Sequence, residues 1–330
     1  MNRREIVRLM AGASAAALAA SARDARAQDD AKAYPGRTIR VIVGFAAGGG
    51  NDIFARLVGQ KLQELIGQPV IIENRPGAGG RLAAAYVAGQ PADGYTILVG
   101  AAGAMSIAPA IYPNLPYQPT HSFVPLTLIG SFPLILSVSP KHAVKTVAEL
   151  VAWAKAHPDQ ANYATTSPGF TIATELLKLK TGMPGVAIPY KSANESVLSV
   201  ISGQTLMAIT DPPPTVPQVK GGQLRALAVT GAKRMDELPD VPSMAELGLP
   251  DVNIGLWSGL FVPAATPPPI AQKIEAELRR AIASPELVAK LKALGVDPGG
   301  IPSEDFRRMI EADIKLYVEV VKAANLTFEE

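Results

Sequence analysis

The feature that most constrains the fold of this chain is a regular alternation of apolar strand patterns with helical patterns. The stretch TIRVIVGFA is rich in β-branched residues and suits a strand buried on both faces. The segment NDIFARLVGQKLQELIG that follows has helical spacing and ends at Gly67. Next come the strand pattern PVIIENR, the helical pattern RLAAAYVAGQ and the strand pattern YTILVG. This βαβαβ order is typical of a parallel sheet with helices on both faces.

The same alternation begins again near PLILSVSP, which indicates a second α/β unit. Thr146 and Glu149 form a capping-box pattern before one of its helices, and Ser243 with Glu246 repeats the pattern at SMAELG, where we expect another helix. With 330 residues the chain is long enough for about two domains. We therefore predict an α/β protein of two lobes, each a mainly parallel sheet flanked by helices. Lobe I would comprise residues 34–131 with 256–330, and lobe II residues 132–255.

The first 27 residues have the features of an export signal. Arg3 and Arg4 precede an Ala-rich apolar run, and Ala25-Arg26-Ala27 has the small-x-small form that signal peptidase cleaves. The run is shorter than a membrane span and is interrupted by Arg8. Residues 1–27 carry five arginines against two acidic residues, so their removal takes the formal net charge from +2 to −1. We therefore predict a periplasmic protein, exported by the Sec or the twin-arginine route, without affinity for nucleic acid.

Glycine-rich loops after strands carry the candidate ligand site. In GFAAGGGNDIFARL three glycines lead into a helix, whose free N–H groups can bind an anion. The glycine spacing does not fit a dinucleotide fingerprint, and Asn51-Asp52 stands where a Walker loop carries lysine. Asp52 would also repel a polyphosphate. One of these two residues can simply cap the helix, which does not exclude a ligand beside the cap.

Two further loops have the same character. The stretch YATTSPGFTIATELLK brings Thr165, Thr166 and Ser167 to the start of a helix, and LVGAAGAMS places Gly100–Gly103 after a strand. Ligands of open α/β sheets bind at the carboxyl ends of strands, so we expect the three loops to face one cleft that holds a small anion. A micromolar ligand needs about −8 kcal/mol, and one charge-assisted hydrogen bond contributes roughly 1.5–3 kcal/mol. Both lobes must therefore contribute donors.

Other residues allow two interpretations each. Lys191 follows a strand and would either meet a carboxylate or stay solvated. Asp211, before three prolines, would either bind a polar end of a ligand or make an Asx turn. Arg75 and Arg81 flank the glycine-rich PGAGG and would suit an anion, unless that loop faces away from the cleft. Trp257 is expected to pack at the crossover between the lobes.

Catalytic and metal-binding patterns are missing from the sequence. Cysteine is absent, and the three histidines have no metal-ligand spacing. No G-x-S-x-G elbow is present. We therefore predict no enzymatic activity, no metal and no cofactor. A periplasmic hydrolase with Ser167 as its nucleophile is the remaining enzymatic alternative, which turnover of an ester or amide would identify.

Several long motifs resemble one known family. The stretches YPGRTIRVIVGFAAGGGNDIFARL, QPVIIENRPGAGG, PADGYTILVG, VKGGQLRALAVT and LPDVPSMAELG are similar to those of the extracytoplasmic binding proteins of tripartite tricarboxylate transporters, called Bug or TctC-like proteins. The likeness runs from about residue 34 to residue 325. It implies a two-lobed periplasmic binding protein, or Venus flytrap, that captures a dicarboxylate, hydroxy acid or aromatic acid directly or through bridging waters. It also implies delivery to a two-component membrane permease. We expect a monomer, and a ligand-sensing partner of a membrane sensor kinase is the alternative role.

The resemblance also implies where the ligand binds. Together with Lys191, the expected ligand-binding residues are Phe45, Ala46, Gly48, Gly49, Asn51, Asp52, Ala102, Gly103, Thr166, Ser167 and Asp211. One departure concerns the second lobe. Many members have a longer loop followed by a histidine, whereas this chain has the compact TTSPGFTIA with Thr171 in that place.

Overall fold

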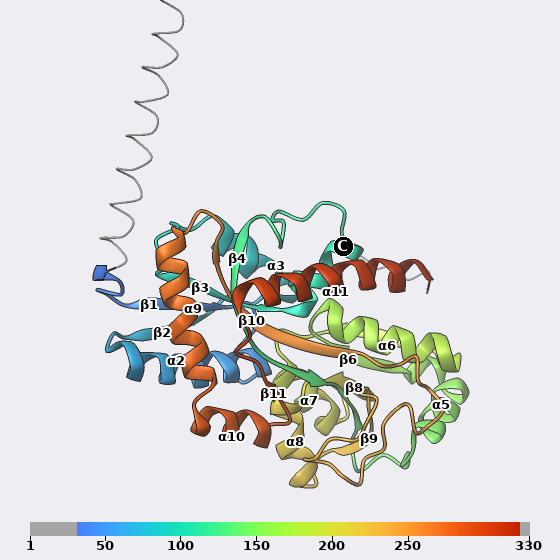
Figure 1. Ribbon diagram of the computed structural model, residues 1–330. Coiled ribbons are helices and arrows are strands. Elements are labelled where there is room, and N and C mark those ends of the chain that lie inside the picture. Colours follow the sequence, from blue (N-terminus) through green and yellow to red (C-terminus); the bar gives the residue numbers. More distant parts are fainter. Residues whose placement is uncertain (1–31, 324–330) are drawn as a thin grey trace, which may run out of the picture.

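The computed structural model describes residues 32–323, which form two lobes, each built around one β-sheet (Figure 1). The predicted signal peptide, residues 1–27, lies outside the described residues. In lobe I the chain first forms β1 (Ile39–Val43), α2 (Gly50–Ile66), β2 (Val70–Asn74), η1 (Ala78–Gly80), α3 (Arg81–Ala88), β3 (Thr96–Ala101), η2 (Gly103–Ile107), α4 (Ala108–Ile111) and β4 (Phe123–Pro133).

The chain then crosses to lobe II and later returns. Lobe II contains β5 (Ile135–Val138), α5 (Val147–Ala156), η3 (Pro158–Gln160), β6 (Asn162–Thr165), α6 (Pro168–Thr181), β7 (Val186–Pro189), α7 (Ala193–Ser202), β8 (Met207–Thr210), α8 (Pro212–Lys220) and β9 (Arg225–Val229). The return segment adds β10 (Gly255–Pro263), α9 (Pro268–Ile282), α10 (Pro285–Ala293), β11 (Asp297–Pro298) and α11 (Ser303–Ala323) to lobe I.

Both sheets are mixed, whereas the sequence predicted mainly parallel ones. The six-stranded sheet has the order β11-β4-β10-β3-β1-β2, in which only β1, β2 and β3 pair in parallel. The five-stranded sheet has the order β7-β6-β8-β5-β9, in which β6 pairs in parallel with β7 and β8 while β5 runs antiparallel to β8 and β9. The antiparallel pair of β4 and β10 arises because the chain leaves lobe I along β4 and returns beside it along β10, in the opposite direction.

Short-range signals set most helix ends. Gly67, Gly182 and Gly203 follow α2, α6 and α7 in the left-handed conformation, which only glycine adopts at little cost. The predicted helix at SMAELG is wrong. Ser243 and Glu246 do exchange both capping-box hydrogen bonds, but the segment makes only turns, because Gly248 and Pro250 leave no room for a second helical turn.

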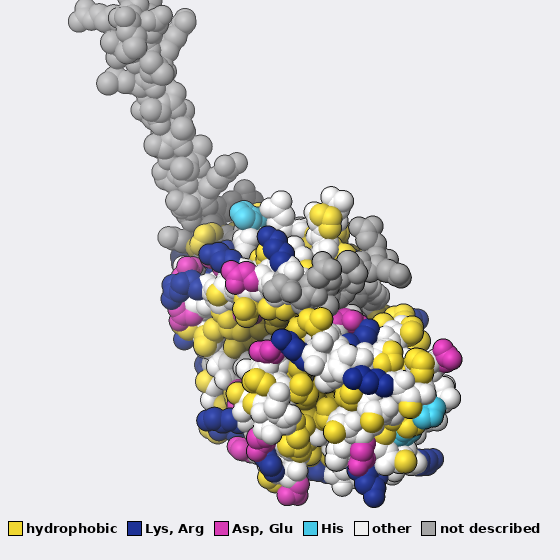
Figure 2. All heavy atoms as spheres, turned by 90° about the vertical axis from the view of Figure 1, so that its right-hand side faces the viewer, with side chains coloured by type: hydrophobic (Ala, Val, Ile, Leu, Met, Phe, Trp, Pro, Cys, Tyr) yellow, Lys and Arg dark blue, Asp and Glu magenta, His cyan; other side chains and the backbone are white. Residues whose placement is uncertain are grey.

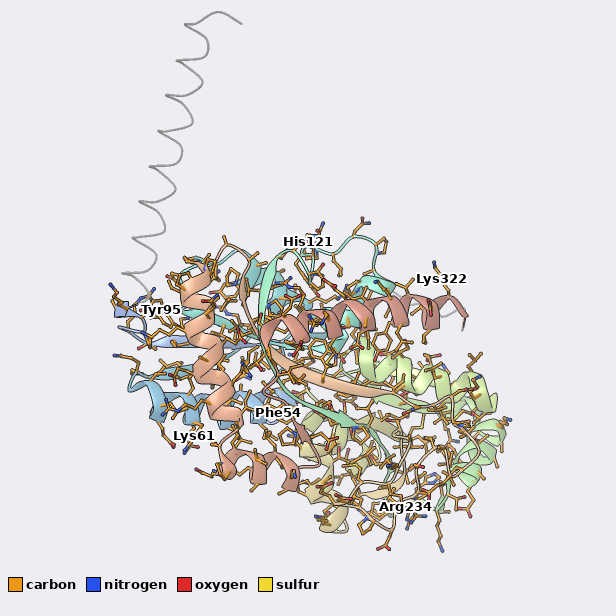
Figure 3. All side chains as sticks on the ribbon, in the orientation of Figure 1. Phe54, Lys61, Tyr95, His121, Arg234 and Lys322 are labelled. Atoms are coloured by element: carbon orange, nitrogen blue, oxygen red, sulfur yellow. The ribbon has the colours of Figure 1, made fainter. Side chains whose placement is uncertain are left out.

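The two lobes are linked by packing as well as by the crossing strands. Phe54 of α2, which is fully buried and labelled in Figure 3, contacts Phe132, where β4 leaves lobe I and the chain crosses to lobe II, with ring centroids 5.7 Å apart. On the side shown in Figure 2, α11 of lobe I lies over α6 of lobe II. The groove between them has a volume of about 460 Å³ and is lined by Leu176, Leu179, Leu316, Tyr317 and Val320, among others. No helix in the part that the structure describes is long and apolar enough to cross a membrane.

Candidate functional site

The glycine loop before α2 lies directly against lobe II. The backbone N–H of Ala46 donates to the carbonyl oxygen of Lys191, 3.1 Å away, across the boundary between the lobes. A Cβ atom added to Gly48 or Gly49 would stand 3.4 Å from lobe II atoms, and one added to Gly50 would stand 1.8 Å from Asp211 Oδ2. The absence of a side chain on Gly50 is what permits the lobes to approach so closely here, since a Cβ on Gly48 or Gly49 would make only ordinary contacts with lobe II.

A second set of contacts joins the lobes at the start of α6. A Cβ added to Gly103 would stand 3.1 Å from Ser167 Oγ and 3.3 Å from the backbone nitrogen of Gly169. Gly79 lies on the same side, since a Cβ there would stand 2.8 Å from Pro168 Cδ. The turn η1 therefore faces lobe II, which the sequence interpretation left open. The glycines of PGAGG were the available signal, because Gly79 has φ +61° and packs where a side chain would collide.

The Asp52 side chain holds the glycine loop in place. One of its oxygens accepts the N–H of Gly48 at 3.0 Å, and the carboxylate forms two hydrogen bonds with Arg56, both 2.9 Å long. Asn74 donates to the other oxygen at 2.8 Å and to the carbonyl of Phe45 at 3.0 Å. Burial alone would raise the pKa of Asp52, but these hydrogen bonds outweigh it and lower that pKa below its ordinary value. Its carboxylate is thus engaged within lobe I.

Asn51 is oriented by the returning strand. Its Oδ1 accepts a hydrogen bond of 2.7 Å from Ser258 of β10. The neighbouring Phe45 is buried, and its ring would lie 3.3 Å from a Cβ on Gly80. Ala102 is buried as well, directly before η2. These residues shape lobe I at the cleft through packing and backbone.

Arginines near the cleft loops are all engaged elsewhere in lobe I. Arg75 stacks over the ring of Tyr86, 3.9 Å from its centroid, and Arg81 over the ring of Tyr112 at 3.7 Å. Arg56 is paired with Asp52, as described above. Lys191 contributes its carbonyl oxygen to the contact between the lobes, while its side chain is exposed. An anion in this cleft would therefore meet backbone N–H groups and hydroxyls.

The start of α6 offers such donors. Ser167 is the N-cap of the helix in extended conformation, and its side chain makes no capping hydrogen bond. Thr166, just before it, is buried, and its Oγ1 has no hydrogen-bond partner in the described part of the chain. The hydroxyls of Thr165 and Thr171 bond to each other at 2.9 Å. Two hydroxyls at a helix N-terminus are thus left for a ligand.

Asp211 stands at the end of the neighbouring strand. It is 1% exposed and is the N-cap of α8, again without a side-chain capping bond. Burial raises the pKa of this carboxyl to about 7, and hydrogen bonds from its own backbone and that of Gly50 only partly offset the increase. Its Oδ1 is buried without a partner. A polar group of this kind is expected to be satisfied by something outside the protein chain.

The histidines lie away from the cleft. His121 lies on the outer side of lobe I (Figure 3), and its ring bonds to Thr120. His142 and His157 both pack against the ring of Trp153 in lobe II. No group of three or more histidine and acidic residues within residues 32–323 could hold a metal ion. Ser167 therefore has no histidine to act as its general base.

Comparison with known proteins gives one consistent family. Residues 54–326 match the family described as "Tripartite tricarboxylate transporter family receptor". The protein BugT of Bordetella pertussis is 33% identical over 295 residues, which cover 88% of this chain and 90% of BugT.

Solved structures agree with this match. The R. palustris protein Rpa4515 with adipate superposes with a TM-score of 0.85 at 33% identity, covering 89% of this chain and 99% of that one. MatC from Rhodopseudomonas palustris with bound malate gives a TM-score of 0.83 at 30% identity, covering 87% and 100%. The periplasmic binding protein BugD superposes with a TM-score of 0.86 at 29% identity, covering 90% of this chain and 100% of BugD. The family and such neighbours are binding proteins, not enzymes.

Proposed function

Since the chain belongs to the TctC, or Bug-type, family of periplasmic solute-binding proteins, we propose that it captures a small carboxylate between its lobes and delivers it to the two-component membrane permease of a tripartite tricarboxylate transporter. The solved structures of two neighbours, Rpa4515 and MatC, are with adipate and with bound malate, both of which are small carboxylates. Residues 1–27 would direct export to the periplasm, where the mature protein would act as a monomer.

One observation carries the proposal. The N-terminus of α6, with the free hydroxyls of Thr166 and Ser167, lies against Gly103 of the other lobe. A carboxylate bound there would touch both lobes at once. Because a ligand shifts a conformational balance only through its different affinity for the two states, contact with both lobes is what would stabilise the closed form.

The lobes are proposed to move as units comprising residues 34–131 with 256–330 and residues 132–255. The two crossing strands join them, since Gly255 at the start of β10 pairs with Pro133 at the end of β4. In this mechanism the ligand-binding groups are the backbone of the loop from Phe45 to Gly49, the backbone of Ala102 and Gly103, and the side chains of Thr166, Ser167 and Asp211. Asn51 and Asp52 would act by shaping the loop.

Thermal melting against a panel of acids tests the proposal. The protein, purified from the periplasm and freed of co-purified ligand by unfolding and refolding, would be melted with dicarboxylates, hydroxy acids, aromatic acids and amino acids. A ligand that binds only the folded state raises the melting temperature by mass action, so a saturable rise is expected for at least one acid. A folded protein whose melting temperature responds to none of them would refute carboxylate binding.

A further inference from the structure

Asp211 is a buried carboxylate without a cation. In the described part of the chain, no lysine or arginine pairs with this carboxyl group, which receives hydrogen bonds from its own backbone and from that of Gly50. Its Oδ2 lies against Gly50, whereas its Oδ1 is buried and accepts no hydrogen bond. An unpaired buried charge is costly, and a buried acceptor is normally satisfied. The free oxygen therefore indicates a missing hydrogen-bond donor.

Asp211 lies at the proposed cleft, so the missing hydrogen-bond donor is expected there as well. Strands β6 and β8 run in parallel with Ala164 opposite Ala208, so Thr166 and Asp211 both lie just past the ends of their strands at one edge of the sheet. Neighbouring strands lie about 4.8 Å apart. Thr166 Oγ1 is also buried without a partner. Two unsatisfied polar side chains thus belong to residues at the same edge of the sheet, near the N-terminus of α6.

Asp211 differs from the other buried groups that have no partner. The remaining ones within residues 32–323 are the hydroxyls of Ser106, Ser137 and Ser196. A hydroxyl can both donate and accept, so it is the least demanding of polar groups. Burial raises the pKa of Asp211 to about 7, so its carboxyl is partly protonated at neutral pH when no ligand is bound. A donor at Oδ1, best of all a positively charged one, would favour the ionised form and satisfy its free oxygen without leaving a proton in the buried site.

We infer that the acid bound in this cleft carries, besides its carboxylate, an ammonium or hydroxyl group that donates to Asp211 Oδ1. This inference rests on the proposed function and narrows its ligand class to amino acids and hydroxy acids. The carboxylate of the ligand is held at the N-terminus of α6, by N–H groups and the hydroxyls of Thr166 and Ser167. The donor then faces the end of β8. The bound molecule is dipolar, and its two ends match the two polar ends of the site.

Matched acids of three sizes test the inference. The first set is propanoate, lactate and alanine, the second succinate, malate and aspartate, and the third 3-phenylpropanoate, 3-phenyllactate and phenylalanine. Within each set the molecules differ only in carrying hydrogen, hydroxyl or ammonium on one carbon. Titration calorimetry on the ligand-free protein should show the amino or hydroxy member of at least one set binding about tenfold or more tightly than its unsubstituted parent, as one charge-assisted hydrogen bond predicts. Comparing the hydroxy acid with the amino acid of the same set shows whether the preferred donor is a hydroxyl or an ammonium group.

The variant Asp211→Asn removes the charge at nearly constant shape. Its amide oxygen can still accept the Gly50 N–H, while its amide nitrogen would face the ligand as a donor. The affinity ratio between the substituted and the unsubstituted acid should fall about tenfold or more. Gly103→Ala is the matched control, because its Cβ would crowd Ser167 Oγ at 3.1 Å rather than Asp211 and should weaken every acid of a set by a similar factor.

The outcomes separate the inference from the proposed function. An unsubstituted acid that binds as tightly as its amino and hydroxy partners would overturn the inference and leave carboxylate binding standing. The same holds if Asp211→Asn, shown by melting to be folded, keeps the wild-type ratio. If the folded protein binds none of the nine acids and no other carboxylate, the proposed function and the inference are both wrong.

Discussion

Replacing Gly50 by alanine should keep the lobes apart without unfolding either of them. Gly50 is the first residue of α2, and its helical backbone is one that alanine also adopts without strain. The new methyl group would stand 1.8 Å from Asp211 Oδ2 and 2.9 Å from its Cγ, although real Cβ contacts stay beyond 3.0 Å. Asp211 is short and 1% exposed, so it has little room to turn away. The lobes must therefore separate by more than about 1 Å at this point.

The loss of affinity follows from the contacts that closure brings together. Separation would stretch the 3.1 Å hydrogen bond from Ala46 to Lys191 and would move Gly103 away from Ser167. If closure brings about two charge-assisted hydrogen bonds to the ligand, worth roughly 1.5–3 kcal/mol each, the affinity should fall about 100-fold or more. The free energy of unfolding of the ligand-free protein should stay the same or rise slightly.

Calorimetry with the acid that the wild type prefers measures the loss of affinity, and small-angle scattering measures the separation of the lobes. The wild type should become more compact with the acid, and Gly50→Ala should not. Gly89→Ala is the matched control, because Gly89 is exposed in lobe I and its Cβ would meet no atom nearer than 3.7 Å.

A second substitution tests whether the clash with Asp211 is what keeps the lobes apart. With Asp211→Ala added to Gly50→Ala, the nearest remaining atom to the new Cβ is Pro213 Cγ at 3.6 Å. The compact form should therefore return at an acid concentration that saturates the Asp211→Ala single variant. Wild-type affinity in Gly50→Ala, or a double variant that stays expanded, would refute the steric argument.

Three further predictions concern single side chains. Asp52→Ala should lower the stability by about 2 kcal/mol in urea denaturation and should also lower the ligand affinity, because the Asp52 carboxylate holds the glycine loop. Ser167→Ala should lower the ligand affinity about tenfold with little change in stability. Equal losses of stability in both variants would show that Ser167 only caps its helix. From about pH 4 to pH 7 the ligand-free protein should lose stability, because burial raises the pKa of Asp211 from 3.8 to about 7 and the folded state keeps a proton that the unfolded state releases. Asp211→Asn should remove this slope, worth up to about 4 kcal/mol, and an unchanged pH profile would contradict it. Trp257→Phe should cost about 1–3 kcal/mol in guanidinium denaturation, because the Trp257 Nε1–H donates to half-buried Asp313 Oδ2 at 2.6 Å. A smaller loss would mean that solvent replaces the donor.

Local rules made the elements of this fold predictable. The strand that ends at Val43 and the helix that ends before Gly67 follow from β-branched runs, 3.6-residue spacing and a glycine cap, all of which act over a few residues. The direction of strand pairing was not predictable in the same way. Whether β10 lies beside β4 or elsewhere depends on the route of the chain between the lobes, which no local pattern encodes.

At the candidate site, too, the sequence predicted positions along the chain better than contacts between distant residues. The sequence predicted that Asp52 and Ser167 stand at helix N-termini, but it could not separate their tasks. The task of Asp52 is decided by Arg56 and Asn74, which reach it from one helical turn away and from a neighbouring strand. The contact of Gly79 with lobe II was missed for a related reason, because it depends on how closely the lobes approach.

The glycine run that the sequence predicted as an anion-binding loop also forms the contact surface with lobe II in this structure. Gly48 and Gly49 present bare backbone to the start of α7, and Gly50 presents it to Asp211, so closure depends on shape rather than on side-chain identity. Contacts of that kind favour a closed form but discriminate poorly between acids, because backbone N–H groups bind any carboxylate alike. Discrimination must then come from the few polar side chains at the edge of the other sheet, chiefly Thr166 and Asp211. A protein built in this way can change its ligand through substitutions at the ends of β6 and β8 while its closing surface stays the same.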